Sequence, residues 1–516
     1  MKTTPDDQTE RKRFAEEVDR NFSVIAAAGT GKTTAITKRI VQIAKIDAEL
    51  LRQGRKPEWL PRLVVVTFTN RAADEMQQRT RQSIFEQSPS PDLLAAFNRA
   101  FFGTIHSFCV KVLAAYGHHL GLPSRLDVID DDEELWNDFV QRTDSVGESL
   151  SPENRKNLLR HVQLRDLMEL GRRGRLPLAI EQGDLDCPAA INIDRVISYP
   201  GSGVRIEADK EALRKWKEQF DTGSDFLPII QRISGSEGFG ERWENTFRDF
   251  NEWLSCCALK VAAEVQAKYR RFRAECGAVT FDDQIALALQ LTRNLEAISH
   301  IRGKDYLVIL DEAQDTDPQQ FEILLEITRP PGAQGRWIEN PKQMPPRSGR
   351  FCMVGDFQQS IYGERADLKQ YRRVHDALIK TGTGEQLQFS VTFRLDQKQI
   401  DFVNKCFQEI LDNCDGQVDF IPLQARPEKL PGQVVRLDVS PANFDSKARD
   451  REKAKAEATQ IARWIKGVNL DKLRARSWEE VAILCPRKRW FAPISNALRE
   501  IGFDSQIQSE IDVKGD

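Results

Sequence analysis

One stretch near the amino terminus decides the fold: Asn21-Phe-Ser-Val-Ile-Ala-Ala-Ala-Gly-Thr-Gly-Lys-Thr-Thr34. It runs from an apolar strand through a glycine-containing loop into a helical pattern at 35–43, which is the context of a phosphate-binding P-loop. Lys32 supplies a cation, and the Thr33 hydroxyl suits a magnesium ion. The residues predicted to bind the phosphates are Ala28, Gly29, Thr30, Gly31, Lys32, Thr33 and Thr34. A small-residue turn is the alternative, because Ala26 stands where such loops usually begin with glycine.

A second apolar run, Tyr306-Leu-Val-Ile-Leu310, is typical of a strand buried on both faces. It ends at two acids, Asp311 and Glu312. Asp311 could hold magnesium through water, and Glu312 could take a proton from an attacking water. A solvated turn is the alternative, but the P-loop upstream favours a nucleotide site.

Further stretches follow one another along the chain: Val66-Thr-Phe-Thr-Asn-Arg-Ala-Ala73, Gly103-Thr-Ile-His-Ser-Phe108, Asp311-Glu-Ala-Gln-Asp-Thr316, Val354-Gly-Asp-Phe-Gln-Gln-Ser-Ile-Tyr362, Thr392-Phe-Arg394 and Val481-Ala-Ile-Leu-Cys485. In this order they resemble the motifs of the UvrD/Rep family of superfamily 1 DNA helicases, of the RecB/AddA-like kind. The resemblance covers about residues 5–110 and 278–515.

The resemblance implies an enzyme that hydrolyses ATP with Mg²⁺. Gln314 and Gln359 resemble glutamines that sense the terminal phosphate, and Lys32 and Glu312 keep the roles given above. Arg394 resembles an arginine finger that reaches across the cleft to the developing phosphoryl charge. An ordinary surface salt bridge is the alternative for Arg394.

On the DNA side, Thr67, Phe68, Thr69 and Asn70 follow an apolar strand, at the strand end where ligands collect in parallel sheets. Their hydroxyls and amides could hold backbone phosphates. Phe68, His106 and Tyr362 could meet bases or nucleotide through their rings. A core role for Phe68 and a structural hydrogen bond for His106 remain alternatives.

The chain departs from the family pattern at several places. Arg11 stands where the family has an adenine-reading glutamine, with Gln8 three residues earlier, and Glu364 replaces a stacking aromatic residue. Residues 328–350 form an apparent insertion between two motifs, with five cations that could touch DNA or a partner, although a solvated loop is the commoner arrangement. Beyond Ile507 the family's last two motifs are not found. We therefore expect a fragment, a second chain that supplies these motifs, or weak ATP hydrolysis.

Composition sets broad limits. The 516 residues, 40% hydrophobic and 30% charged with a net charge of -3, are typical of a soluble globular protein of several domains. No run approaches the roughly 18 apolar residues of a membrane span, and the nine cysteines form no disulfide framework. We therefore expect a cytoplasmic protein without a membrane partner.

The expected fold is α/β. Residues 1–120 and 278–380 are predicted to form one RecA-like lobe with a parallel sheet, 121–277 an inserted helical subdomain, and 381–516 a partial second RecA-like lobe. In that second lobe we expect strands near 387–391, 434–439 and 481–485 and helices at 452–466 and 491–501. Arginines at 171–175 and 270–273 are candidate phosphate-binding patches or ordinary charged helix faces.

Two functions are set against each other. The first is an ATP-dependent translocase or helicase on single-stranded DNA, moving 3′ to 5′ by resemblance, in repair, recombination or phage defence. The second is a nucleotide-dependent DNA-binding switch or loader for a partner nuclease, with weak or partner-dependent ATPase activity. Glu312, Gln359 and Arg394 favour turnover, whereas the missing motifs favour the switch.

Overall fold

The computed structural model describes residues 7–88, 90–123, 125–129, 131–173, 176, 185–223, 225–360, 368–411, 420–428, 432–439, 450–485 and 487–507. Tyr362 and Glu364 lie outside these residues. The chain divides into two compact units, Met1–Arg394 with Gln408–Pro427, and Leu395–Phe407 with Glu428–Asp516. Within the described part, every helix is too short or too polar to span a lipid bilayer.

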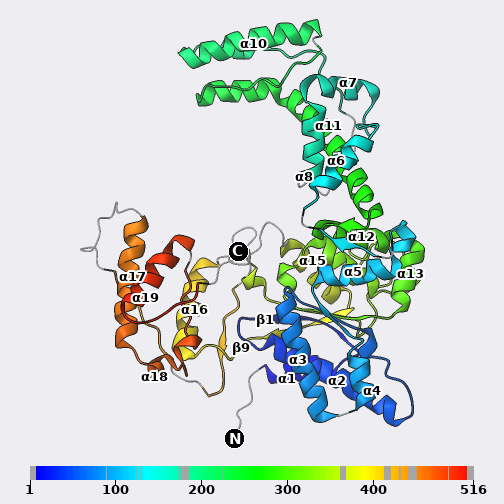
Figure 1. Ribbon diagram of the computed structural model, residues 1–516, viewed down its shortest axis with the longest axis vertical. Coiled ribbons are helices and arrows are strands. Elements are labelled where there is room, and N and C mark those ends of the chain that lie inside the picture. Colours follow the sequence, from blue (N-terminus) through cyan, green and yellow to red (C-terminus); the bar gives the residue numbers. More distant parts are fainter. Residues whose placement is uncertain are drawn as a thin grey trace. The chain divides into compact units, whose positions relative to one another are not determined.

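A six-stranded parallel sheet forms the centre of the first unit (Figure 1). Its spatial order is β3 (Phe101–Gly103), β2 (Leu63–Val66), β6 (Leu307–Leu310), β7 (Phe351–Gly355), β1 (Asn21–Ala26) and β8 (Gly384–Phe389). Val24 of β1 pairs with Val354 on one side and Leu387 on the other. The expected α/β class with a parallel sheet is confirmed.

Helices cover both faces of this sheet, because alternate side chains of each strand point to opposite faces. Val65 and Ile309 join one core with α1 (Gln8–Glu16), α2 (Lys32–Arg52), α3 (Asn70–Gln87) and α4 (Pro91–Phe97). Val64 and Val308 join the other core. The helices of that second face are α5 (Ile105–Tyr116), α12 (Phe281–Arg293), α13 (Leu295–Gly303), α14 (Pro318–Ile327) and α15 (Leu368–Lys380).

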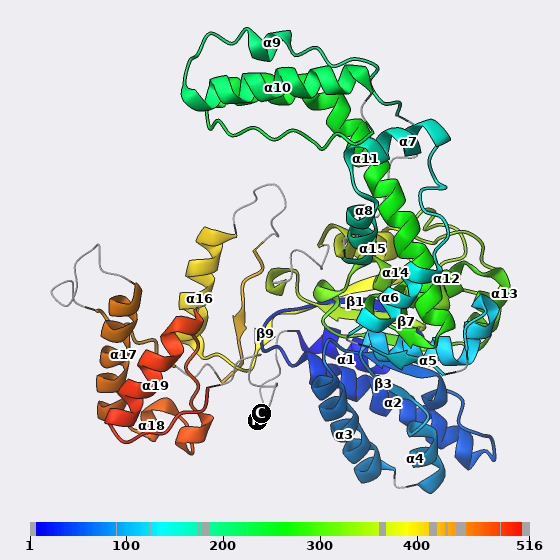
Figure 2. The same cartoon turned by 45° about the horizontal axis from the view of Figure 1, so that its top comes forward.

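The segment between β3 and β6 is mainly helical (Figure 2). The 39-residue helix α11 (Glu237–Glu275) packs against α6 (Glu133–Arg142), α7 (Pro152–His161), α8 (Leu164–Arg173) and α9 (Asp194–Ile197), with α10 (Val204–Thr222) in the same aromatic-rich core. The chain enters through β4 (Asp127–Val128) and leaves through β5 (Ala278–Val279), which pair in parallel.

Three of the candidate phosphate-binding arginines are used inside the protein. Arg172 pairs with Asp132, and Arg270 and Arg273 both pair with Asp283. The side chains of Arg172 and Arg273 are only 6% and 9% exposed. These three side chains therefore hold helices together and do not form a free cationic surface.

One strand that was expected in the second lobe belongs to the first unit. The sequence assigned a strand near 387–391 to the second lobe, but β8 occupies this stretch and pairs along its length with β1 of the first sheet. The apolar pattern that identifies a strand carries no information about which sheet it joins.

The insertion at 328–350 has many exposed residues but is anchored in the protein core, so it is not a fully solvated loop. Trp337 is fully buried and Arg329 is 1% exposed. Arg329 donates to the backbone oxygens of Gly335 and Met344, so the segment wraps around a buried guanidinium. Four of its five cations are in ion pairs: Arg329 with Glu326, Arg336 with Glu322, and Arg347 and Arg350 with Asp305. The sequence missed this arrangement because Glu326 and Asp305 lie outside the insertion.

The second unit is helical in its described residues. The expected helices appear as α17 (Asp450–Gly467) and α19 (Phe491–Glu500), which pack on each other through Ala458 and Ile494. Helix α18 (Leu470–Leu473) follows α17, and α16 (Gln397–Ile410) begins in this unit. The expected strands at 434–439 and 481–485 are absent from the described residues, because a strand needs a hydrogen-bonded partner and none pairs with them here.

Candidate functional site

The P-loop follows β1 and leads into α2. Gly29 and Gly31 both adopt left-handed backbone conformations, with φ of 71° and 80°, which residues other than glycine adopt only at a cost. Gly31 occupies the N-cap of α2 without a side-chain cap. The first amides of α2 are therefore left for an anionic ligand.

A chain of hydrogen bonds joins Gln314 to three of the four predicted catalytic residues, all except Arg394. Lys32 Nζ lies 2.8 Å from Glu312 Oε2, and Gln314 Nε2 donates to the same oxygen at 2.8 Å. Gln314 Oε1 accepts the backbone N–H of Asp356 at 2.9 Å, and Gln359 Nε2 donates to Asp356 Oδ2 at 2.7 Å. Four predicted residues from three separate segments are thereby brought together.

Burial raises the pKa values of the carboxyl groups in this cluster, namely Asp311, Asp315 and Asp356. Burial, and next the charge of Glu312, raise the pKa of Asp311 to about 7. Burial is also the main cause that raises the pKa of Asp315 to about 6 and the pKa of Asp356 above its ordinary value. A cation at this site would offset the cost of ionising these carboxyls.

The donors present fit magnesium. Asp311 and Thr33 offer hard oxygen ligands, and no group of three His, Cys, Asp or Glu side chains gathers as a metal site in the part of the chain described. Magnesium commonly binds through one or two protein oxygens together with water and substrate phosphates. The chemistry of the site therefore suits a metal shared with a nucleotide.

Arg394 lies beside the P-loop in the same unit, not on a separate lobe. The backbone N–H of Phe393 donates to Gly29 O at 2.9 Å. A Cβ placed on Gly29 would meet Thr392 Oγ1 at 2.7 Å and Arg394 Cβ at 2.8 Å. The segment after β9 (Val391–Thr392) is thus packed directly against the phosphate-binding loop.

Arg11 is engaged with its neighbours. It donates to Asp7 and to Thr30 O, at 2.6 Å in each case. Its guanidinium lies 4.7 Å from the centroid of the Phe389 ring and 5.2 Å from that of Phe393. Phe393 is 44% exposed beside Gly31. Its ring was not among the residues predicted from the sequence, although it lies within the motif Thr392-Phe-Arg394.

The residues predicted to contact DNA that the structure describes lie at the end of β2 and the start of α3 and α5. Thr67 Oγ1 donates to Thr69 O, and Thr69 Oγ1 caps α3, so both hydroxyls already have partners in the protein. Asn70 is the first residue of α3. Phe68 is 48% exposed, which disfavours a core role.

His106 meets a ring that the sequence did not single out. Its imidazole lies 5.6 Å, centre to centre and edge-on, from the ring of Phe281. Phe281 is the first residue of α12 and is 53% exposed. Its exposed position depends on a helix start that follows the inserted segment, so no pattern near the P-loop could have indicated it.

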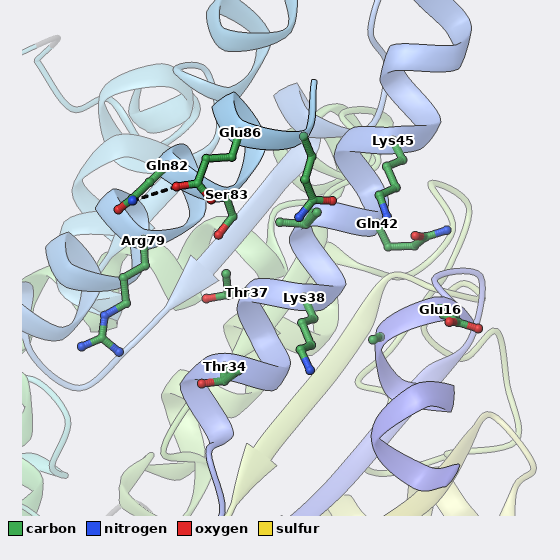
Figure 3. A pocket seen from close by; sticks show the side chains of 13 residues that line it. Glu16, Thr34, Thr37, Lys38, Gln42, Lys45, Arg79, Gln82, Ser83 and Glu86 are labelled. Atoms are coloured by element: carbon green, nitrogen blue, oxygen red, sulfur yellow. Dashed lines mark hydrogen bonds between the residues drawn. The ribbon is translucent and has the colours of Figure 1, made fainter. Parts of the chain in front are cut away.

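A groove of about 600 Å³ lies between α1, α2 and α3 (Figure 3). Thr34 stands at its P-loop end, and its walls mix the basic Lys38 and Arg79 with the acidic Glu16 and Glu86. The residues that line the groove do not include Lys32 or the acids after β6, so it is separate from the catalytic cluster.

Comparison with known proteins places this geometry in a family. Residues 7–377 match the UvrD/REP helicase N-terminal domain. Among curated relatives, an ATP-dependent helicase/nuclease subunit from Oenococcus oeni is 23% identical over 88% of this chain and 44% of its own length. The proteins of the same name from Thermoanaerobacter sp. and Clostridium perfringens are 24% and 23% identical, over 80% and 78% of this chain and 40% and 38% of their own lengths. The chain thus spans about two fifths of these relatives. It belongs to the UvrD/REP helicase N-terminal domain family.

Proposed function

We propose that this chain is the nucleotide-binding part of an ATP-driven motor that moves along single-stranded DNA. The observation that carries the proposal is the contact between Lys32 Nζ of the P-loop and Glu312 Oε2, at 2.8 Å. Gln314 donates to the same Glu312 oxygen. These are the groups needed to bind a triphosphate, activate water and sense the terminal phosphate.

The pair of Lys32 and Glu312 sets the order of events. Lys32 leaves Glu312 to bind the phosphates of ATP, and Glu312 then becomes free to accept a proton from the attacking water. Asp311 and Thr33 would hold magnesium, which would supply positive charge to offset that of the phosphates. Arg394, beside Gly29, offers its guanidinium to the phosphoryl group.

In this proposal, the base of ATP and the bases of the DNA strand contact different aromatic side chains. Phe393, exposed beside Gly31 and backed by Arg11, is positioned to stack on the nucleotide base. Phe68, His106 and Phe281 offer ring faces and edges to bases of the single strand.

The names of the relatives suggest further steps. Because they are called helicase/nuclease subunits, we propose a nuclease, or a chain that completes the motor, as partner. We also propose 3′ to 5′ movement in DNA repair, recombination or phage defence, in the cytoplasm.

ATP hydrolysis with and without single-stranded DNA tests the proposal. We expect DNA to stimulate the wild type, Lys32→Ala to lose nucleotide binding, and Glu312→Gln to bind nucleotide but hydrolyse it roughly 10²- to 10⁴-fold more slowly. Glu86→Gln, on the separate groove, is the matched control and should hydrolyse ATP at the wild-type rate.

One result would count against the motor, and a second would count against the role of Glu312. Nucleotide binding without turnover in the wild type would favour a switch or loader. Unchanged turnover in Glu312→Gln would show that water is activated elsewhere.

A further inference from the structure

A buried tyrosine, Tyr371, has a hydroxyl without a described hydrogen-bond partner close to Gln314. Tyr371, on α15, is fully buried, and its ring stacks on Phe357 with centroids 4.2 Å apart. Its hydroxyl has no hydrogen-bond partner among the described residues. A buried donor without a partner is uncommon and costly, so this one needs an explanation.

The hydroxyl points toward the residues that sense phosphate. A Cβ placed on Gly355 would lie 2.8 Å from Tyr371 Oη and 2.9 Å from Gln314 Oε1. Burial raises the pKa of Tyr371, and the negative charges of Asp356 and Glu312 raise it further. The absence of a side chain at Gly355 thus leaves the hydroxyl and the amide oxygen facing the same small space.

The ring itself is held in place. Phe357 stacks on Tyr371, and Phe321 lies nearly parallel to it with centroids 6.1 Å apart. Helix α15 is also tied to the P-loop strand, because His375 Nδ1 lies 2.7 Å from Ser23 Oγ of β1. The hydroxyl is therefore a fixed donor, and any new partner has to move to it.

Gln314 is the group that has to move. In this state its amide nitrogen donates to Glu312, and its oxygen accepts from the backbone of Asp356. A triphosphate that took Lys32 away from Glu312 and drew the Gln314 amide toward its terminal phosphate would pull the amide oxygen away from the Asp356 N–H. The amide oxygen would then need another donor.

We propose that Tyr371 is a positioning residue that donates to Gln314 Oε1 in the nucleotide-bound state. This inference rests on the proposed function, because it requires that nucleotide binds at Lys32. The hydroxyl has no partner among the described residues of the resting protein and gains one once nucleotide is bound, so it favours the bound arrangement of Gln314.

The test compares wild type, Tyr371→Phe and Tyr306→Phe with a non-hydrolysable ATP analogue and Mg²⁺. Tyr371→Phe keeps the ring and removes only the hydroxyl. We expect its melting temperature without nucleotide to equal or exceed that of wild type, because an unpaired hydroxyl is lost. We expect its affinity for the analogue to fall roughly 2- to 10-fold, and the melting shift caused by the analogue to shrink.

Tyr306→Phe is the matched control, since Tyr306 precedes β6 at the end away from Asp311. It should bind the analogue like wild type. Gly355→Ala places a methyl group between the hydroxyl and the amide and should weaken binding at least as much as Tyr371→Phe.

Wild-type affinity in Tyr371→Phe would overturn the inference and leave the motor intact. A lower melting temperature without nucleotide would also overturn it, because the hydroxyl would then already be paired. Failure of the wild type to bind the analogue would instead refute the proposed function.

Discussion

Gly29 shows how one residue fixes the phosphate site. Its φ of 71° favours glycine, and a methyl group there would meet Thr392 Oγ1 at 2.7 Å and the side chain of Arg394. A side chain at this position would therefore displace the predicted arginine finger as well as strain the backbone. Conformation and packing both require glycine at this position.

We predict that Gly29→Ala destabilises the protein more than Gly54→Ala and also weakens nucleotide binding. Gly54 has a nearly identical φ of 73° but nothing within 4 Å of an added Cβ. The left-handed conformation alone costs about 1–2 kcal/mol in either variant. Urea unfolding and nucleotide titration of both proteins measure the excess. Equal losses in the two variants would mean that the packing against Thr392 and Arg394 is unimportant.

At the scale of elements, a buried charge cluster organises the insertion at 328–350. Glu326 on α14 accepts hydrogen bonds from Arg302 Nη2 at 2.6 Å, from Arg329 Nη1 at 2.7 Å and from the backbone of Trp337 at 2.7 Å. One carboxylate thus joins two buried guanidinium groups, one on α13 and one at the start of the insertion. Removing its charge would leave both cations without a counter-ion.

We predict that Glu326→Gln lowers the free energy of unfolding by about 3–5 kcal/mol, because breaking a buried ion pair leaves an uncompensated charge. Glu339→Gln is the control, since Glu339 pairs with Arg336 while 58% exposed. That variant should change stability by about 1 kcal/mol or less. Chemical denaturation compares them, and a small effect in Glu326→Gln would indicate that the insertion does not depend on this cluster.

These elements also show what the sequence could and could not predict. The P-loop and Glu312 were identifiable because their residue types follow apolar strands directly in the chain. The unit to which Arg394 belongs was not identifiable, because it depends on the pairing of β8 with β1. The burial of Arg329 was missed for a related reason, since its counter-ion precedes the insertion on α14.

At the scale of the whole molecule, the parallel sheet explains why residues predicted to bind nucleotide and residues predicted to bind DNA lie at one edge. The P-loop follows β1, Thr67 follows β2, Asp311 follows β6 and Asp356 follows β7. In a parallel sheet these strand ends share an edge, where ligands collect. The two predicted sites nevertheless use different side chains, so we expect that one can be altered without the other.

We predict that Phe281→Ala reduces affinity for single-stranded DNA by roughly 5- to 100-fold, the usual cost of losing one base-stacking ring. Nucleotide affinity without DNA should not change, because Phe281 lies at the start of α12 and contacts His106. The dependence of DNA affinity on salt should also keep its slope, because that slope reports phosphate contacts and not stacking.

Phe85→Ala supplies the matched control, since Phe85 is a comparably exposed ring on α3, at 58%. Fluorescence anisotropy with labelled oligonucleotide, at several salt concentrations, measures both variants. If Phe85→Ala loses as much affinity as Phe281→Ala, exposed rings contribute non-specifically and the stacking site is wrong. If instead the dependence of DNA affinity on salt becomes weaker in Phe281→Ala, the ring acts by positioning groups that bind DNA phosphates. The DNA-binding site would then consist of those groups and not of the ring.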